Sequence, residues 1–349
     1  MPLQIIGSNS DNNFILKNIT NNGQFLLKRN EEILDALYSF STFTFTNAGA
    51  IGRNGPTFAQ MLNAYTGSAT WAATASYFTS SIRGIQNWTV PQTAVYRITA
   101  AGAKGGNSPS VNLTGGFGAI IVTDLTFSQG QVISIVVGQS GSDRSTGSTF
   151  NGGSGGGGTF IYESSSINYY VAVGGGGGAG GSLTNILNNQ LTASGKFNTT
   201  SGTSIRISNN FFASGGVGGN GGGRSNRNIL YGGPGAGINS SGSAANNTQG
   251  LSRVGFWLGG STGSTSNANA REGGFGGGGA AGDGDASTDG NTIGWAGGGG
   301  GYSGGAAGGN GGASDSQYGG GGGTFYTGSF VSGASNWNNG HGYAIITKL

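Results

Sequence analysis

Side chains of the types that carry out catalysis are scarce and scattered in this sequence. It contains one histidine, His341, no cysteine and 12 acidic residues. His341 lies between two glycines just before a C-terminal run of strand-forming residues, where a polar turn residue is common. Glu163, Glu272 and Asp315 are far apart in the sequence, so no acid and base pair stands out. We therefore expect no enzymatic activity, no cofactor and no catalytic residues.

One loop has the oxygen-rich composition of a cation site. Asp283-Gly284-Asp285 is followed closely by Asp289-Gly290-Asn291. Closely spaced acids bind Ca²⁺, but the EF-hand pattern also needs a glutamate at its last loop position, and none is present there. The favoured interpretation is a structural loop without metal, with cation binding as the alternative. The glycine runs described below lack the Gly-Lys-Ser/Thr ending of a phosphate-binding loop.

The residues best suited to binding lie between the glycine runs. Loops on a rigid scaffold often carry binding, and arginine with aromatic residues is typical of contact surfaces. The segment 182–213 is polar with scattered apolar residues. The segment 224–257 supplies our candidate contacts with a receptor or another partner: Arg224, Arg227, Tyr231, Arg253, Phe256 and Trp257. The alternative is that both segments only cap and cover the glycine runs.

The elements that would position these segments are the glycine runs themselves. The chain has 79 glycines in 349 residues, and near-pure runs occur at Gly155–Gly158, Gly174–Gly181, Gly215–Gly223, Gly273–Gly279, Gly297–Gly312 and Gly319–Gly323. Several runs begin or end on an apolar segment, such as the YYVAV before Gly174. The polyproline-II conformation has three residues per turn and no internal hydrogen bonds, so adjacent all-glycine chains can bond to one another on every side. We predict a bundle of polyglycine-II helices over residues 174–322, with disordered low-complexity sequence as the alternative.

Strand-forming segments surround the glycine block. They recur, with turn signals between them, at 43–46, 82–90, 94–101, 117–127, 131–137, 159–162 and 169–173, and they return at 323–327 and 342–348. This pattern predicts a mainly β protein built as a sandwich or jelly roll from residues 41–173 and 323–349. The glycine block is then an insertion held at both ends by one sandwich.

Residues 1–40 differ in composition and form a predicted N-terminal module. Two short strands are expected at 14–19 and 23–28, around a turn at 21–23. A short helix is expected at 30–38, with Asn30 as its N-cap. The module is interpreted either as a hairpin packed on the core or as a device for attachment or oligomerisation.

Composition limits the classes of function. The 15 Lys and Arg residues exceed the 12 acidic residues by three, which gives a net charge of +3. Charged residues make up only 8% of the chain. This balance does not favour nucleic-acid binding, and no apolar stretch reaches the ~18 residues that a membrane span needs. The N-terminus lacks the basic and apolar regions of a signal peptide, so we expect a protein that leaves its cell by assembly or lysis. Without cysteine, durability outside a cell would depend on packing and backbone hydrogen bonds.

An ordered series of motifs resembles the glycine-rich extracellular region of the anaplastic lymphoma kinase and leukocyte tyrosine kinase receptors. The series runs from residue 43 to residue 349 and includes FTNAGAIGRNGPT at 45–57, Tyr65, GIQNWTVP at 84–91, YRI at 96–98, GA and GG at 102–103 and 105–106, IVVGQSG at 135–141, GGGGTF at 155–160, Val173 with its run, and GGFG at 273–276. The resemblance implies a TNF-like β-sandwich with an inserted polyglycine-II bundle. It does not carry over receptor signalling, because this chain lacks a kinase, a transmembrane helix and the cysteines of that region.

These observations together favour a structural or surface protein of a virus or phage particle. Its expected partners are other virion proteins, further copies of itself, and possible host receptors or glycans. Glycine-rich lattices are also known in phage tail-tip adhesins, although no motif here matches them. The alternatives are a cellular surface or secreted adhesin and, as the least favoured, an enzyme that acts on polysaccharide.

Overall fold

The chain divides into two compact units, Met1–Leu37 and Tyr38–Leu349. The computed structural model describes residues 3–8, 14–18, 24–27, 35–109, 112–143, 152–180, 190–208, 211–224, 232–243, 248–255, 257–261, 272–282, 295–309 and 318–349. Each unit is described by itself below.

The first unit is a three-stranded antiparallel sheet, in which β1 (Leu3–Ser8), β2 (Phe14–Asn18) and β3 (Gln24–Leu27) pair in chain order. The pairing of β2 with β3 confirms the predicted hairpin, and β1 was not predicted. The expected helix at 30–38 is wrong over residues 35–38, which have no helical structure, and its first residues lie outside the described part of the chain. A two-turn helix is marginal by itself, so packing of the following aromatic residues can override its propensity.

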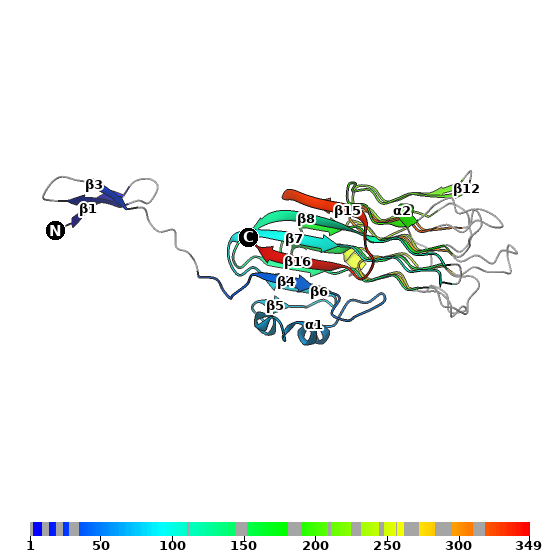
Figure 1. Ribbon diagram of the computed structural model, residues 1–349, viewed down its shortest axis with the longest axis horizontal. Coiled ribbons are helices and arrows are strands. Elements are labelled where there is room, and N and C mark those ends of the chain that lie inside the picture. The colour runs from blue at the N-terminus through cyan, green and yellow to red at the C-terminus, as the bar shows by residue number, and fades with distance from the viewer. Residues whose placement is uncertain are drawn as a thin grey trace. The chain divides into compact units, whose positions relative to one another are not determined.

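The second unit contains two large antiparallel sheets (Figure 1) and a small two-stranded sheet within the glycine-rich insertion. The five-stranded sheet has the order β15-β8-β7-β16-β4, and its strands are Ser329–Asn338, Gly118–Phe127, Ala94–Ala101, Tyr343–Lys348 and Thr42–Phe45. The six-stranded sheet has the order β14-β11-β10-β9-β6-β5, and its strands are Phe325–Tyr326, Tyr169–Val173, Thr159–Glu163, Val132–Val136, Ile85–Thr89 and Phe78–Thr79. The fold is thus mainly β, as predicted.

Both sheets contribute to one hydrophobic core, as the two layers of a sandwich do. Ile98, Ile121 and Ile346 come from the five-stranded sheet, and Ile133 and Ile135 come from the six-stranded sheet; all are fully buried. Because side chains alternate along a strand, Ser134 and Val136 of β9 face the opposite side of their sheet. That outer face packs in a second apolar cluster with Trp257 and Phe275 of the glycine-rich insertion.

Both ends of the insertion join neighbouring strands of the six-stranded sheet. It begins after β11 and ends at β14, which is paired with β11 at Val171–Tyr326 and Ala172–Phe325. The chain then continues through β15 to β16, which lies between β7 and β4. A single sandwich therefore holds both ends of the insertion. Within it, the structure has only short elements among its described residues: α2 (Gln190–Ala193), β12 (Ile205–Ser208), β13 (Phe211–Ala213) and η3 (Arg253–Gly255).

Several elements of the second unit were not predicted, among them a helix and an edge strand. Helix α1 (Phe58–Tyr65) begins at a capping box in which Thr57 accepts from the Gln60 N–H and Gln60 accepts from the Thr57 N–H. The Thr-Phe-Ala-Gln spacing is a recognisable start signal for this helix. Strand β15 is rich in Ser, Gly and Asn and has no fully buried residue, and it lies at the edge of its sheet, where it pairs with β8. A 3₁₀ turn, η1 (Thr70–Ala73), follows α1.

Tyr38 and Phe40 mark the start of the second unit and should stabilise it. Tyr38 stacks on Trp71 with ring centroids 5.4 Å apart, and its hydroxyl donates to the carbonyl of Thr89. Phe40 lies 5.1 Å from the ring of Trp88. A chain that begins at Tyr38 should therefore be more stable than one that begins at Ser41 by about 2–4 kcal/mol, the value of two partly buried aromatic side chains. Thermal unfolding of both chains measures this difference, and equal melting temperatures would show that the aromatic cluster does not need these two residues.

Candidate functional site

The body of the insertion is a lattice of glycine segments bonded through their backbones. The central segment, 297–302, donates its N–H groups in a pattern with a period of three. Residues 297 and 300 donate to 153 and 156, residues 298 and 301 to 233 and 236, and residues 299 and 302 to 320 and 323. A repeat of three is the period of the polyproline-II conformation, and this pattern is what the predicted polyglycine-II helix would produce.

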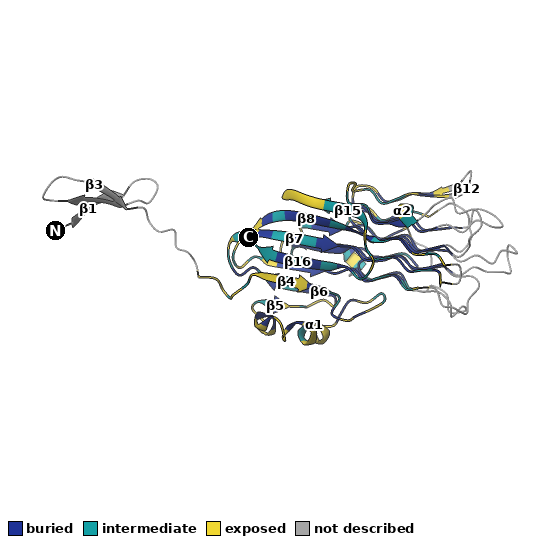
Figure 2. Ribbon diagram, viewed as in Figure 1, coloured by how far each residue is buried: buried dark blue, intermediate teal, exposed yellow. Residues whose placement is uncertain are grey.

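The carbonyl groups of the same segment bond to three other neighbours. Gly297 and Gly300 accept from Gly178 and Gly175, Gly298 accepts from Gly279, and Gly299 accepts from Gly305. The central segment is therefore bonded to six different segments, all by backbone groups, and its glycines are buried. Figure 2 shows much of the described lattice in the dark blue of buried residues. A rod held on six sides cannot bend or slide without breaking many bonds together, so the lattice should be rigid.

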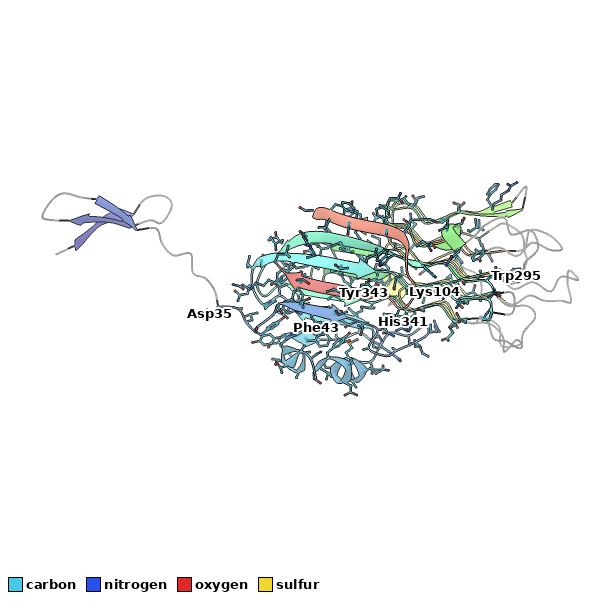
Figure 3. All side chains as sticks on the ribbon, in the orientation of Figure 1. Asp35, Phe43, Lys104, Trp295, His341 and Tyr343 are labelled. Carbon is cyan, nitrogen blue, oxygen red and sulfur yellow. The ribbon has the colours of Figure 1, made fainter. Side chains whose placement is uncertain are left out.

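The described ends of these segments meet at one end of the lattice, which we call the lattice end. Asp143 accepts from the backbone and side chain of Asn107, and Gly153 donates to Ala179 at 2.8 Å. Gly282 forms a β-bridge with Trp295, and Gly308 donates to Ala296 at 2.9 Å. The lattice end lies away from the strands of the sandwich (Figure 1), and Figure 3 shows Trp295 there, far from Phe43 of β4.

The described residues on either side of four connections lie at the lattice end. These connections join 143 to 152, 180 to 190, 282 to 295 and 309 to 318. Their sequences are rich in Ser, Thr and Asn, and their charged residues are Arg144, Asp283, Asp285, Asp289 and Asp315. Such side chains offer adaptable hydrogen bonding in recognition loops.

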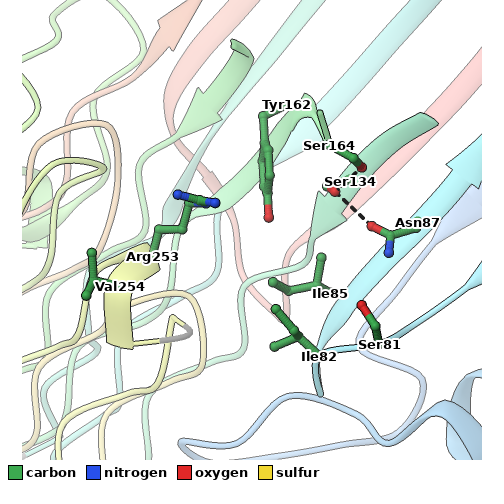
Figure 4. Close-up of a pocket in the computed structure, with 9 residues that line it drawn as sticks. All are labelled: Ser81, Ile82, Ile85, Asn87, Ser134, Tyr162, Ser164, Arg253 and Val254. Atoms are coloured by element: carbon green, nitrogen blue, oxygen red, sulfur yellow. Dashed lines mark hydrogen bonds between the residues drawn. The ribbon is translucent and has the colours of Figure 1, made fainter. Parts of the chain in front are cut away.

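A second feature is a pocket on the outer face of the six-stranded sheet, which we call the Arg253 pocket (Figure 4). Its volume is about 340 Å³, and it is lined by Ser81, Ile82, Ile85, Asn87, Ser134, Tyr162, Ser164, Arg253 and Val254. Strands β6, β9 and β10 supply one wall, and η3 of the insertion supplies the other. Figure 4 shows the Arg253 guanidinium pointing toward Tyr162 and facing the polar wall.

Hydrogen bonds fix the polar wall of this pocket. Ser134 Oγ donates to Asn87 Oδ1 at 2.8 Å and also shares a hydrogen bond with Ser164 Oγ. Burial raises the pKa of Tyr162, and hydrogen bonding to Ser134 and the positive charge of Arg253 offset part of that increase. Tyr162 therefore stays a neutral phenol at physiological pH.

The structure separates the six predicted contact residues. Arg224 is exposed and directly follows Gly223 of the lattice, whereas Arg253 lines the pocket. The prediction that Trp257 is a surface contact is wrong, because its side chain is fully buried. Its ring stacks on that of Phe160, with the ring centroids 3.8 Å apart. Arg227, Tyr231 and Phe256 lie outside the described residues. A tryptophan offers a large apolar surface to the interior as readily as to a partner, so sequence alone did not distinguish the two.

The Asp283–Asp289 loop, the alternative cation site, also lies outside the described residues. Among the residues that the structure describes, no three His, Cys, Asp or Glu side chains are grouped closely enough to hold a metal ion. Within the same residues, no helix is both long and apolar enough to cross a membrane.

The pocket and several of its polar residues were not predicted from the sequence. Asn87 and Ser134 lie on strands that we expected, at positions between residues that face inward. Polar residues at outward positions are ordinary in a sheet exposed on one face, so they gave no signal of a pocket. Only the structure shows that η3 lies over the outer face of the six-stranded sheet and completes the pocket.

His341 has a structural position consistent with its predicted role in a turn. Its Nδ1 accepts a hydrogen bond from the backbone N–H of Ser140 at 3.0 Å, and burial lowers the pKa of the imidazole. The neutral form is therefore favoured in the folded protein, since protonation would also remove the acceptor. No described residue turns this arrangement into a catalytic pair: Ser140 contributes its backbone N–H.

This pKa shift predicts a pH dependence of stability. Because the folded-state pKa is below the usual value, the unfolded chain takes up the proton first as the pH falls below about 6.5. Stability from His341 is complete above that pH and decreases as the pH drops toward the folded-state pKa. We expect the melting temperature to fall between pH 7 and pH 5, and to fall less in His341→Asn, whose amide oxygen can still accept from Ser140. If the melting temperatures of the two proteins change with pH by the same amount, His341 is not the source of this pH dependence.

Comparison with known proteins shows a partial relationship. No protein-family model matches the chain. A stretch of 107 residues, 31% of this chain, is 35% identical to the leukocyte tyrosine kinase receptor of Mus musculus, and the aligned stretch spans only 12% of that receptor. This match agrees with the resemblance noted in the sequence and supports a related glycine-rich domain.

Proposed function

We propose that this chain is a rigid attachment module whose lattice end carries the binding surface. The observation that carries the proposal is the shared position of the segment ends: the described ends of the backbone-bonded segments lie together at one end of the lattice, and the connections that join them are polar in sequence. A rigid scaffold lowers the entropy cost of holding several binding segments close together. The other end of the insertion is anchored in a sandwich, which leaves the lattice end free to face a partner.

The similarity to a receptor favours a location on a surface or outside a cell. The sequence matches a part of a protein named as a receptor, and that likeness brings surface display and ligand binding to this chain as proposals. The partner would be a surface receptor or a glycan, and no catalysis is needed for this role. The lack of cysteine fits a protein whose cohesion comes from packing and backbone bonds.

The surface we propose is that of a virus or phage particle. A body with few charges, no disulfides and a densely bonded lattice is suited to exposure on a durable particle. The second candidate, a cellular surface adhesin, is favoured by the receptor similarity. Proteomics of purified particles and of cell-surface fractions from the source separates the two. Presence in particles supports the first, and presence only in the cell-surface fraction supports the second.

Binding through the lattice end can be tested with the full chain. A fluorescently labelled protein should bind to the cells that its source infects or colonises. Replacement of residues 283–294 and 310–317 by Gly/Ser sequences of equal length should remove most of that binding. The control is Asn63→Ala on the exposed side of α1, which lies on the sandwich. Equal binding by the loop-replaced chain, with an unchanged melting temperature, would overturn the proposal.

A further inference from the structure

We propose that the Arg253 pocket binds an acidic sugar residue, that is, a sugar ring that carries a carboxylate. The pocket lies on the face of the six-stranded sheet, away from the lattice end, so this site is additional to the attachment surface proposed above. The inference does not depend on the attachment role, since it is made from the residues of the pocket alone.

The first argument is the positive charge of Arg253 and the absence of a compensating acid. None of the nine lining residues is Asp or Glu. Among the described residues, the ion pair found is Arg97 with Asp124, on the other sheet, so Arg253 has no described carboxylate partner. A guanidinium presents paired N–H donors that match the two oxygens of a carboxylate. A pocket with this charge and no acid favours an anionic group.

The second argument is the direction of the hydrogen bonds in the polar wall. Ser134 donates its proton to Asn87 Oδ1, so Ser164 must donate to Ser134 in the hydrogen bond that the two hydroxyls share. This leaves Asn87 Nδ2 as a free donor among the described contacts and leaves lone pairs on Ser164 as acceptors. A ligand with both acceptors and hydroxyl donors would satisfy them, and a sugar ring has both.

The third argument is size and the apolar margin. A pocket of about 340 Å³ is at the small end of ligand sites, of the order expected for one sugar ring. Ile82 and Val254 are 38% and 84% exposed and stand on opposite walls, so apolar contacts are available to the C–H faces of a ring. The pocket is open to solvent on one side, as a site that binds the end of a sugar chain must be. Together these features favour the terminal or side residue of an acidic polysaccharide or glycoprotein glycan.

The test uses three small probes with the full-length protein. Sodium glucuronate carries the carboxylate and the ring, glucose has the ring without the carboxylate, and acetate has the carboxylate without the ring. We expect glucuronate to shift the amide resonances of Asn87, Ser134 and Ser164 in an NMR titration, with at least tenfold tighter binding than either glucose or acetate. Inorganic sulfate is included to show whether any anion suffices.

Two substitutions make the test specific. Arg253→Gln removes the charge and should weaken glucuronate binding about tenfold or more, because a hydrogen bond to a charged group is lost. Asn87→Asp keeps the shape and the bond from Ser134 but adds a negative charge, so it should also weaken binding by at least tenfold. The matched control is Arg206→Gln, an exposed arginine of β12 outside the pocket, which should leave the titration unchanged.

The results of the sugar titration decide whether the Arg253 pocket binds an acidic sugar, and they do not bear on the attachment proposal. Selective glucuronate binding that both pocket variants lose supports the inference. No saturable shifts, equal affinity for sulfate or acetate, or full binding by a folded Arg253→Gln would overturn it. None of these outcomes alters cell binding through the lattice end, and loss of cell binding in the loop-replaced chain would leave the sugar titration intact.

Discussion

Gly299→Val should prevent the glycine lattice from forming and should destabilise the second unit by more than about 3 kcal/mol. A Cβ built on Gly299 would lie 2.3 Å from the carbonyl oxygen of Gly175 and 2.8 Å from its carbon, both backbone atoms. No side chain can rotate away to make room, so whole segments would have to separate. Overpacking in ordinary cores costs about 1–3 kcal/mol. Here the separation would also break backbone hydrogen bonds with several neighbours.

The matched control for this substitution is Gly67→Val. Gly67 lies in an exposed turn, and nothing is within 4 Å of a Cβ at that position. It should melt within a few degrees of the natural protein. Thermal unfolding and near-ultraviolet circular dichroism of both variants make the comparison. If Gly299→Val melts like Gly67→Val, the central segment is not packed as the structure has it.

Much of the sandwich could be predicted from the sequence because its strands carry a strong local signal. The alternation at 94–101 and the apolar segment at 131–137 each correspond to a strand within one residue at either end. β15 was missed because its Ser, Gly and Asn residues form a strand only through pairing with β8. The glycine runs indicated packing through their ordered borders, but their bonding partners come from distant parts of the chain. No local pattern contains that information.

The candidate site was less predictable, for a related physical reason. Arg253 and Trp257 are four residues apart and were grouped as contact residues, yet one lines a pocket and the other is buried against Phe160. Their separation is set by how the insertion crosses the six-stranded sheet. The boundary near residue 40 was also approximate, since Tyr38 and Phe40 pack into the second unit. In each case a tertiary contact decided the role of an aromatic side chain.

The second large effect concerns hydrogen exchange. The amides of Gly297–Gly301 should exchange at least about 10⁴-fold more slowly than in the urea-denatured chain, because each donates to a backbone carbonyl inside the lattice. The proton donors are consecutive, so no residue of the segment should be left unprotected. Mass spectrometry of fragments that cover 295–309 makes the measurement, and the same fragment from the denatured chain supplies the reference rate.

The lattice should also open as one unit, and this follows from the free energies involved. Ordering one backbone residue costs about 1–2 kcal/mol, whereas one hydrogen bond contributes about 1 kcal/mol net. A single glycine segment is therefore unstable alone, and it becomes stable only when six neighbours hold it and it holds them. Protection in 155–158, 174–178 and 319–323 should match that in 297–301 within about tenfold. Exchange at random-coil rates in the central segment would contradict the packed lattice. Protection that differed widely among the segments would show that they open independently and not as one cooperative unit.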